Sequence, residues 1–143
     1  MMKNKINYLI LLLSAGLIFS SCQDEDEKPV LAAPTMSNIE LGLGNNEMAE
    51  IGKDFHFEAD VVAGDKIEDI QINIRQKTGE NYSGPWSFEV VWDEYKGLKN
   101  TNIHQHFDIP EDAVEGIYDF VITVNDQNGE SVEVVRNLTI YSE

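Results

Sequence analysis

Apolar and polar residues alternate with a period of two along most of this chain, which is the spacing of half-buried β-strands. The alternation predicts seven strands, around Ile39, Leu41 and Leu43; Phe55, Phe57, Ala59 and Val61; Ile70, Ile72 and Ile74; Trp86, Phe88, Val90 and Trp92; Ile103, Phe107 and Ile109; Tyr118, Phe120, Ile122 and Val124; and Val132, Val134, Leu138 and Ile140. Arg136 interrupts the last set. Helical spacing is not sustained over a useful length. The pattern predicts one all-β domain over residues 35–143, an immunoglobulin-like Greek-key β-sandwich of about seven strands.

Turn residues and one aromatic motif support this fold. Asn128-Gly129 separates the last two predicted strands, and Asn-Gly supplies the positive φ angles that a tight hairpin requires. These two strands should therefore be antiparallel neighbours. Residues 116–120, Gly-Ile-Tyr-Asp-Phe, are similar to the tyrosine corner of immunoglobulin-like domains. That similarity places Phe120 where antibody domains have their second disulfide cysteine, so an apolar ring would replace the bridge.

The N-terminal residues follow a different pattern. Lys3 and Lys5 precede an apolar run over residues 8–19, and small residues then lead to Cys22. This is the order of a secretory signal peptide. The run is too short for a transmembrane helix, which needs roughly 20 apolar residues, and acidic rather than basic residues follow it.

Phe19-Ser-Ser-Cys22 resembles the cleavage site of bacterial lipoproteins, although Phe19 stands where leucine is usual. The resemblance implies a signal peptide over residues 1–21, a lipid such as palmitate on Cys22, and an acidic lipidated tether over residues 22–34. The run Gln-Asp-Glu-Asp-Glu at 23–27 resembles the export tag of Bacteroidetes surface lipoproteins. It implies attachment to the outer membrane at the cell surface. A solvated tether explains the same acidic run, and both interpretations can hold together.

Charge and cysteine content narrow the possible partners. The chain has 26 acidic and 10 basic residues, a formal net charge of -16, and the predicted cleavage removes Lys3 and Lys5 but no carboxylate. Such a surface repels nucleic acid and anionic headgroups, and favours cations, neutral glycans or basic protein surfaces. Cys22 is the only cysteine, so a lipid there leaves none for a disulfide, a thiolate metal site or a nucleophile.

All three histidines fall on the predicted solvent side of two strands. His56 and Glu58 alternate with inward-facing phenylalanines, and His104 and His106 alternate with Ile103 and Phe107. The second and fifth strands of an immunoglobulin-like sandwich are antiparallel neighbours, so the three imidazoles should meet on one exposed patch. Three nitrogens suit Zn²⁺ or Cu²⁺, with Glu58, Asp108 or water completing the shell. The alternative is that these are surface histidines paired with nearby carboxylates, and the sequence does not determine the cross-strand register.

Aromatic residues offer a second candidate site. Tyr82, Trp86 and Tyr95 lie in or beside a Gly-Pro loop and the strand that follows it, and exposed aromatic rings stack on sugars. The competing interpretation, which we favour, places Trp86 and Trp92 on the inward face.

The histidine pattern and the Gly-x-Tyr-x-Phe corner together resemble the immunoglobulin-like lipoproteins of Bacteroidetes grouped as domain-of-unknown-function family 4625. The resemblance covers the chain from about Thr35 onward and implies no particular activity. Motifs for nucleophilic catalysis and phosphate binding are missing from the sequence. We therefore expect a non-catalytic binding or adhesion module at the membrane, with a metal ion, a glycan or a protein as its partner. The alternatives are a glycan-binding accessory module and a metal-dependent hydrolase, and the hydrolase would need an open water position and a substrate cleft over the histidines.

Overall fold

The structure is a computed structural model that describes residues 30–143. The signal peptide, Cys22 and most of the predicted tether lie outside the described residues. The described chain forms eight strands, β1 (Thr35–Leu41), β2 (Met48–Glu50), β3 (Asp54–Val62), β4 (Ile67–Gln76), β5 (Ser87–Trp92), β6 (Asn100–Asp108), β7 (Gly116–Asp126) and β8 (Ser131–Tyr141). Among residues 30–143, no helix has the length and apolar character needed to cross a membrane.

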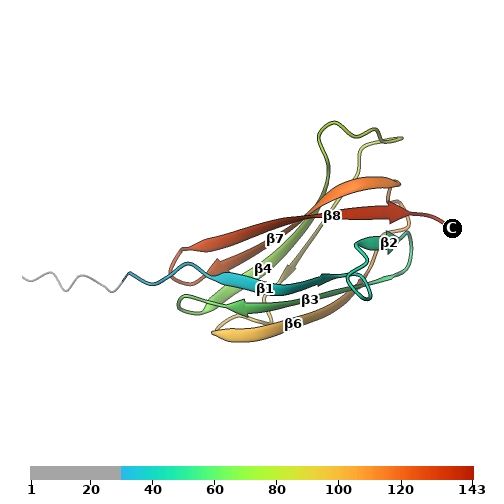
Figure 1. The fold of residues 1–143 in the computed structure, drawn as a ribbon. Helices are drawn as coiled ribbons and strands as arrows, with labels where there is room; N and C mark the ends of the chain where they lie inside the picture. The colour runs from blue at the N-terminus through green and yellow to red at the C-terminus, as the bar shows by residue number, and fades with distance from the viewer. Residues whose placement is uncertain (1–29) are drawn as a thin grey trace, which may run out of the picture.

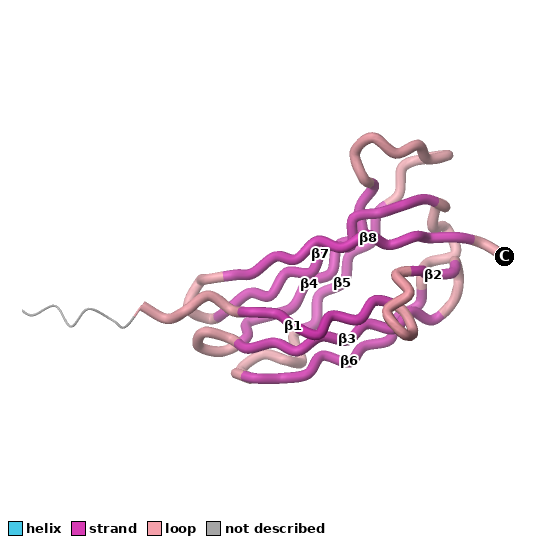
Figure 2. Tube along the Cα trace, in the orientation of Figure 1, coloured by secondary structure: helices cyan, strands magenta, loops and turns pink. Residues whose placement is uncertain are grey.

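The strands form two sheets that pack face to face (Figures 1 and 2). One sheet has the order β1-β3-β6, and the other has the order β2-β8-β7-β4-β5. Neighbouring strands are antiparallel except for β2 and β8, which are parallel. The predicted all-β sandwich is confirmed. The sequence pattern missed β2, because three residues are too few to display an alternation.

The core lies between the sheets and is built from the predicted alternating positions. Phe120 on β7 packs against Phe55 and Phe57 on β3, with ring centroids 5.8 Å apart in both cases. Trp92 on β5, in the same sheet as Phe120, stacks on Phe57. Phe120, which the sequence similarity equates with the second disulfide cysteine of antibody domains, therefore joins the two sheets through apolar ring contacts.

The tyrosine corner is also present. Tyr118 is fully buried, and its hydroxyl donates to the carbonyl oxygen of Val114 at 2.7 Å. Burial raises the pKa of Tyr118 above its ordinary value. Gly116 has φ 153°, and a side chain there would meet the ring of Tyr82 at 2.5 Å. The motif thus fixes the start of β7 through one hydrogen bond and one close contact that only glycine allows.

Two details differ from the sequence prediction. Leu43 was placed on the inward side of the first strand, but β1 ends at Leu41, the chain turns, and Leu43 is 76% exposed. The β7–β8 hairpin was expected to use two residues with positive φ. Only Gly129 has one, because four residues separate the strands and the chain reverses in a four-residue turn that the bond from Gly129 N–H to Asp126 O closes. The predicted antiparallel pairing of β7 with β8 is confirmed.

Arg136, which interrupts the alternation of β8, ends in an ion pair at the margin of the sandwich. It lies opposite Phe120 in the β7–β8 register, so its side chain starts from the inward face. The guanidinium contacts the carboxylate of Glu47 in the loop between β1 and β2. A long side chain can thus occupy an inward position near an edge while its charge stays paired and partly solvated.

Candidate metal site

The candidate site lies on the outer face of the three-stranded sheet. β3 is the central strand of that sheet, and its residues alternate between the core and this face. In the β3–β6 register His56 is opposite His106, and Glu58 is opposite His104. The predicted convergence of the three histidines is therefore confirmed, and the register that the sequence left open is decided.

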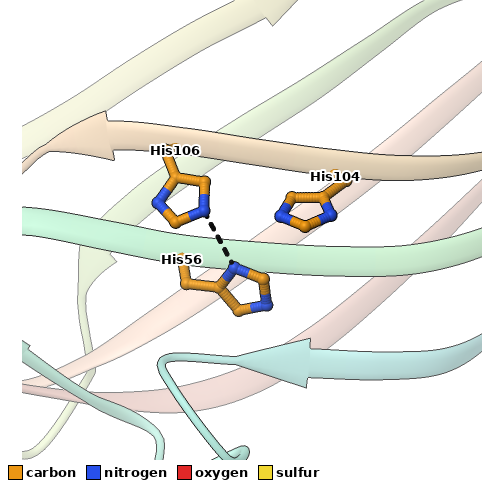
Figure 3. Close-up of side chains that lie close together, drawn as sticks. All are labelled: His56, His104 and His106. Atoms are coloured by element: carbon orange, nitrogen blue, oxygen red, sulfur yellow. Dashed lines mark hydrogen bonds between the residues drawn. The ribbon is translucent and has the colours of Figure 1, made fainter.

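The three imidazoles are arranged like ligands around one small ion (Figure 3). His56 Nδ1 and His106 Nε2 are 3.3 Å apart, and one nitrogen from each of the three rings lies within 4.8 Å of the others. Nitrogens bound to Zn²⁺ at 2.0–2.1 Å in a tetrahedral shell are about 3.3 Å apart. The distance between His56 and His106 matches this spacing, and the nitrogen of His104 lies within 4.8 Å of both. The residues therefore fit a transition-metal ion, whereas metal binding itself stays a prediction.

The three histidines differ in burial. His104 and His106 are exposed, whereas His56 is only 8% exposed even though it points away from the core. Its ring is covered by the rings of His104 and His106, whose centroids are each 5.0 Å away. The expectation of one fully exposed patch is thus corrected, because a ring on the central strand is sheltered by side chains from its neighbours.

Asp54 holds the ring of His106. Its Oδ2 lies 2.6 Å from His106 Nδ1, within hydrogen-bonding distance. The ring N–H therefore donates to the carboxylate, and Nε2 on the other side of the ring is directed toward His56 Nδ1. A carboxylate on the second nitrogen of a metal-binding histidine fixes the ring tautomer and raises the basicity of the ligand.

Two carboxylates lie beside the other nitrogen of His56. Nε2 is 3.7 Å from Glu40 Oε1 and 3.9 Å from Glu58 Oε2. Glu58 was predicted as a fourth ligand of the three-histidine set, but the contacts place it in a second group of potential ligands, Glu40, His56 and Glu58. Sequence reasoning missed Glu40. The alternation turns it outward, but only the pairing of β1 with β3 brings it next to His56.

Two hollows lie near the site but not over the three histidines. One of 170 Å³ borders His56 at the β1–β2 loop, and neither His104 nor His106 lines it. Another of 470 Å³ lies further along the same sheet around Asp60 and Asn102.

The aromatic candidates are held in structural contacts. The Tyr82 hydroxyl accepts from Lys77 N–H at 2.8 Å and donates to Ile117 O, and Trp86 packs edge-on against Tyr118 at 5.3 Å. Tyr95 lies beyond the opposite end of β5 from Trp86, and its hydroxyl accepts from Gln105 at 2.8 Å. The structure does not bring the three together, and a role in glycan contact stays a prediction.

Comparison with known proteins settles the family. Residues 20–141 match the family described as Domain of unknown function (DUF4625). The chain belongs to this family. The predicted resemblance to family 4625 is therefore confirmed for the domain, and the three histidines of the candidate site lie inside the matched region. No curated protein matches the chain.

Two solved structures share the DUF4625 domain's fold. A Niemann-Pick type C2 protein from Japanese carpenter ant superposes with a TM-score of 0.55 at 8% identity, covering 78% of this chain and 95% of that one. The sporulation control protein Spo0M from Bacillus subtilis superposes with a TM-score of 0.50 at 13% identity, covering 79% of this chain and 51% of that one. At these identities the similarity establishes the fold alone.

Proposed function

We propose that this chain is a non-catalytic binding module of the cell surface that takes up one Zn²⁺ or Cu²⁺ ion through His56, His104 and His106. A lipid on Cys22 anchors it to the outer membrane of a Bacteroidetes bacterium. The observation that carries the metal assignment is the convergence of three ring nitrogens within 4.8 Å of one another.

The chemistry of the donors supports a borderline transition metal. Neutral imidazole nitrogens bind Zn²⁺ and Cu²⁺ well, whereas Ca²⁺ prefers six to eight oxygen ligands. The hydrogen bond from His106 to Asp54 supplies the outer-shell partner typical of such sites. The formal charge of -16 attracts cations to the surface, so salt should weaken the approach of the ion.

The open setting of the histidines supports binding rather than catalysis. Catalytic zinc sites combine three protein ligands with a bound water in a cavity that excludes bulk solvent. Here His104 and His106 are exposed on the face of a sheet, and neither of them lines the nearby hollows of 170 and 470 Å³. A substrate would gain few contacts from such a face.

The direct test of the metal site is calorimetry with Zn²⁺, Cu²⁺ and Ca²⁺ on protein purified without a histidine tag, together with elemental analysis. We expect saturable uptake of Zn²⁺ and Cu²⁺ at neutral pH and none of Ca²⁺. Uptake should weaken in acid, because metals bind neutral imidazole and free histidine is protonated below about pH 6.5. Equal uptake by a triple alanine variant at His56, His104 and His106 would refute the site.

The test of the anchor is Cys22→Ala, which should abolish incorporation of labelled fatty acid. The support is sequence-based, because Cys22 is the only cysteine and follows a charged start and a short apolar run. Acyl label on the variant would disprove the anchor.

Alanine at Asp24, Glu25, Asp26 and Glu27 should keep the lipid but reduce access of external protease. Unchanged access would reduce the acidic run to a tether.

A further inference from the structure

His56 presents its two ring nitrogens to two different groups of side chains. Nδ1 is directed toward His106, and His104 belongs to the same group (Figure 3). Nε2 lies beside Glu40 Oε1 and Glu58 Oε2. The second group also has one potential ligand atom per residue within 4.8 Å of the others. One imidazole is therefore shared between two potential ligand sets.

Distances distinguish these carboxylates from the one on His106. Asp54 is 2.6 Å from His106 Nδ1, which is a hydrogen bond. Glu40 and Glu58 are 3.7 and 3.9 Å from His56 Nε2, beyond the roughly 2.7–3.2 Å of such a bond. Those separations are close to the 3.3 Å or so between neighbouring ligands of a tetrahedral ion. The gap leaves space for an ion between His56 Nε2 and the two carboxylates.

Both glutamates are already oriented by other groups. Asn102 donates to Glu58 Oε1 at 2.9 Å, which leaves Glu58 Oε2 facing His56. The backbone N–H of Gly44 donates to Glu40 Oε1 at 2.9 Å. A carboxylate oxygen has two lone pairs, so Glu40 Oε1 can accept this bond and still bind a cation.

The two carboxylates concentrate negative charge beside His56 Nε2. Like charges that lie close together repel one another, and a cation placed among them relieves this repulsion.

We propose that the domain binds two divalent metal ions and that the imidazole of His56 bridges them. The first ion is held by His56 Nδ1, His104 and His106, and the second by His56 Nε2, Glu40 and Glu58. This inference rests on the proposed function for the first ion. Occupancy of both sites displaces the single N–H proton of the neutral His56 ring to solvent, so the ring becomes imidazolate, and neither metal changes oxidation state. One nitrogen and two carboxylates suit Zn²⁺ or Mn²⁺ at the second site.

The first experiment is the stoichiometry of Zn²⁺ binding to the exported, untagged full chain in detergent. We expect two equivalents for the native protein and one for the Glu40→Gln/Glu58→Gln variant. The His104→Ala/His106→Ala variant should also bind one, now at the carboxylate site. Glu133→Gln is the matched control, since Glu133 carries the same charge at an exposed position of β8, in the other sheet. It should bind two.

The other possible stoichiometries distinguish a failure of the second metal site from a failure of the three-histidine site. One equivalent that persists in the glutamine variant and is lost with the histidines overturns the second site and leaves the proposed function intact. One equivalent with the opposite pattern overturns both the bridge and the three-histidine site. No uptake at all overturns both proposals.

The second experiment tests the bridge by electron paramagnetic resonance with Cu²⁺. Two copper ions joined by one imidazolate couple magnetically, so the fully loaded protein should give far less signal than its copper content. The glutamine variant should restore the signal of one isolated ion. Full signal from two bound ions would show that they do not share His56.

Discussion

The two faces of β3 use one backbone for two purposes. The inward residues are at most 2% exposed, and they are Phe55, Phe57, Ala59 and Val61. The outward residues carry the titratable groups, and they are Asp54, His56, Glu58 and Asp60. Because side chains alternate strictly along a strand, a change on one face leaves the other nearly untouched. The inward face stabilises the sandwich, and the outward face is free for chemistry.

The two faces also differ in what their function requires. Burial of apolar area depends little on which ring meets which, so the inward face tolerates repacking. The outward face needs particular atoms at particular distances, such as the 3.3 Å between His56 and His106. Substitutions should therefore separate stability from metal binding, and the following predictions are ordered by the size of the expected effect.

Phe120→Ala should cause the largest loss of stability. The ring is fully buried between the sheets and contacts Phe55 and Phe57, so its removal leaves a cavity and should lower the free energy of unfolding by about 3–5 kcal/mol. Urea denaturation measures this. Val135→Ala, at a position 45% exposed on the outer face of β8, is the control and should change stability by less than about 0.5 kcal/mol. Equal losses in both variants would contradict the assigned core.

His106→Ala should weaken metal binding and leave the stability of the metal-free protein nearly unchanged. Loss of a direct ligand should weaken Zn²⁺ binding by at least about a hundredfold, more than the loss of an outer-shell partner. The metal-free protein should keep its stability to within about 0.5 kcal/mol, since the ring is exposed. Calorimetry and urea denaturation of the same samples measure both quantities. Asn100→Ala, at an exposed position of the same strand, should change neither, and a large stability loss in His106→Ala would break the division between the two faces.

Asp54→Asn should have a smaller effect on the metal. The variant keeps an acceptor for His106 Nδ1–H but loses the charge that makes His106 a stronger ligand, so Zn²⁺ affinity should fall by about 10- to 100-fold. Competition with a chelator measures this fall. Asp60→Asn removes the same charge from the same face without contacting a histidine and should change affinity far less. Equal effects would mean that only the general negative field matters.

The smallest predicted effect concerns Asp126, a buried carboxylate outside the metal face. Burial alone would raise its pKa, but backbone N–H groups of Asn128 and Asp65 bond to it and hold the pKa below the ordinary value. A pKa that is lower in the folded state contributes stability above the unfolded pKa of about 3.9, and this contribution is lost as the pH falls through the folded pKa.

Asp126→Asn should therefore reduce stability at pH 7 by about 1 kcal/mol and by less at pH 3. Urea denaturation at both pH values checks the difference. A gap between variant and native protein that is the same at both pH values would refute the role of the charge. Metal uptake should be unchanged, because Asp126 is at the β7–β8 hairpin and not on the outer face of β3.

The sequence by itself determined every described strand except β2, the sandwich, and the side of each strand on which His56, His104 and His106 lie. These follow from alternation, which is a local property of a strand, and from the turn and corner motifs. The prediction that Leu43 faces inward was wrong, because apolar alternation alone does not show where a strand ends.

Only the tertiary structure decided which atoms meet. The contact of His56 with His106 joins residues 50 positions apart, and the approach of Glu40 to His56 depends on how β1 pairs with β3. A shift of one residue in either pairing would have kept the same strands and separated these groups. The register depends on packing summed over whole sheets, so no short stretch of sequence contains it. The same long-range pairing decides which nitrogen of His56 faces imidazole and which faces carboxylate.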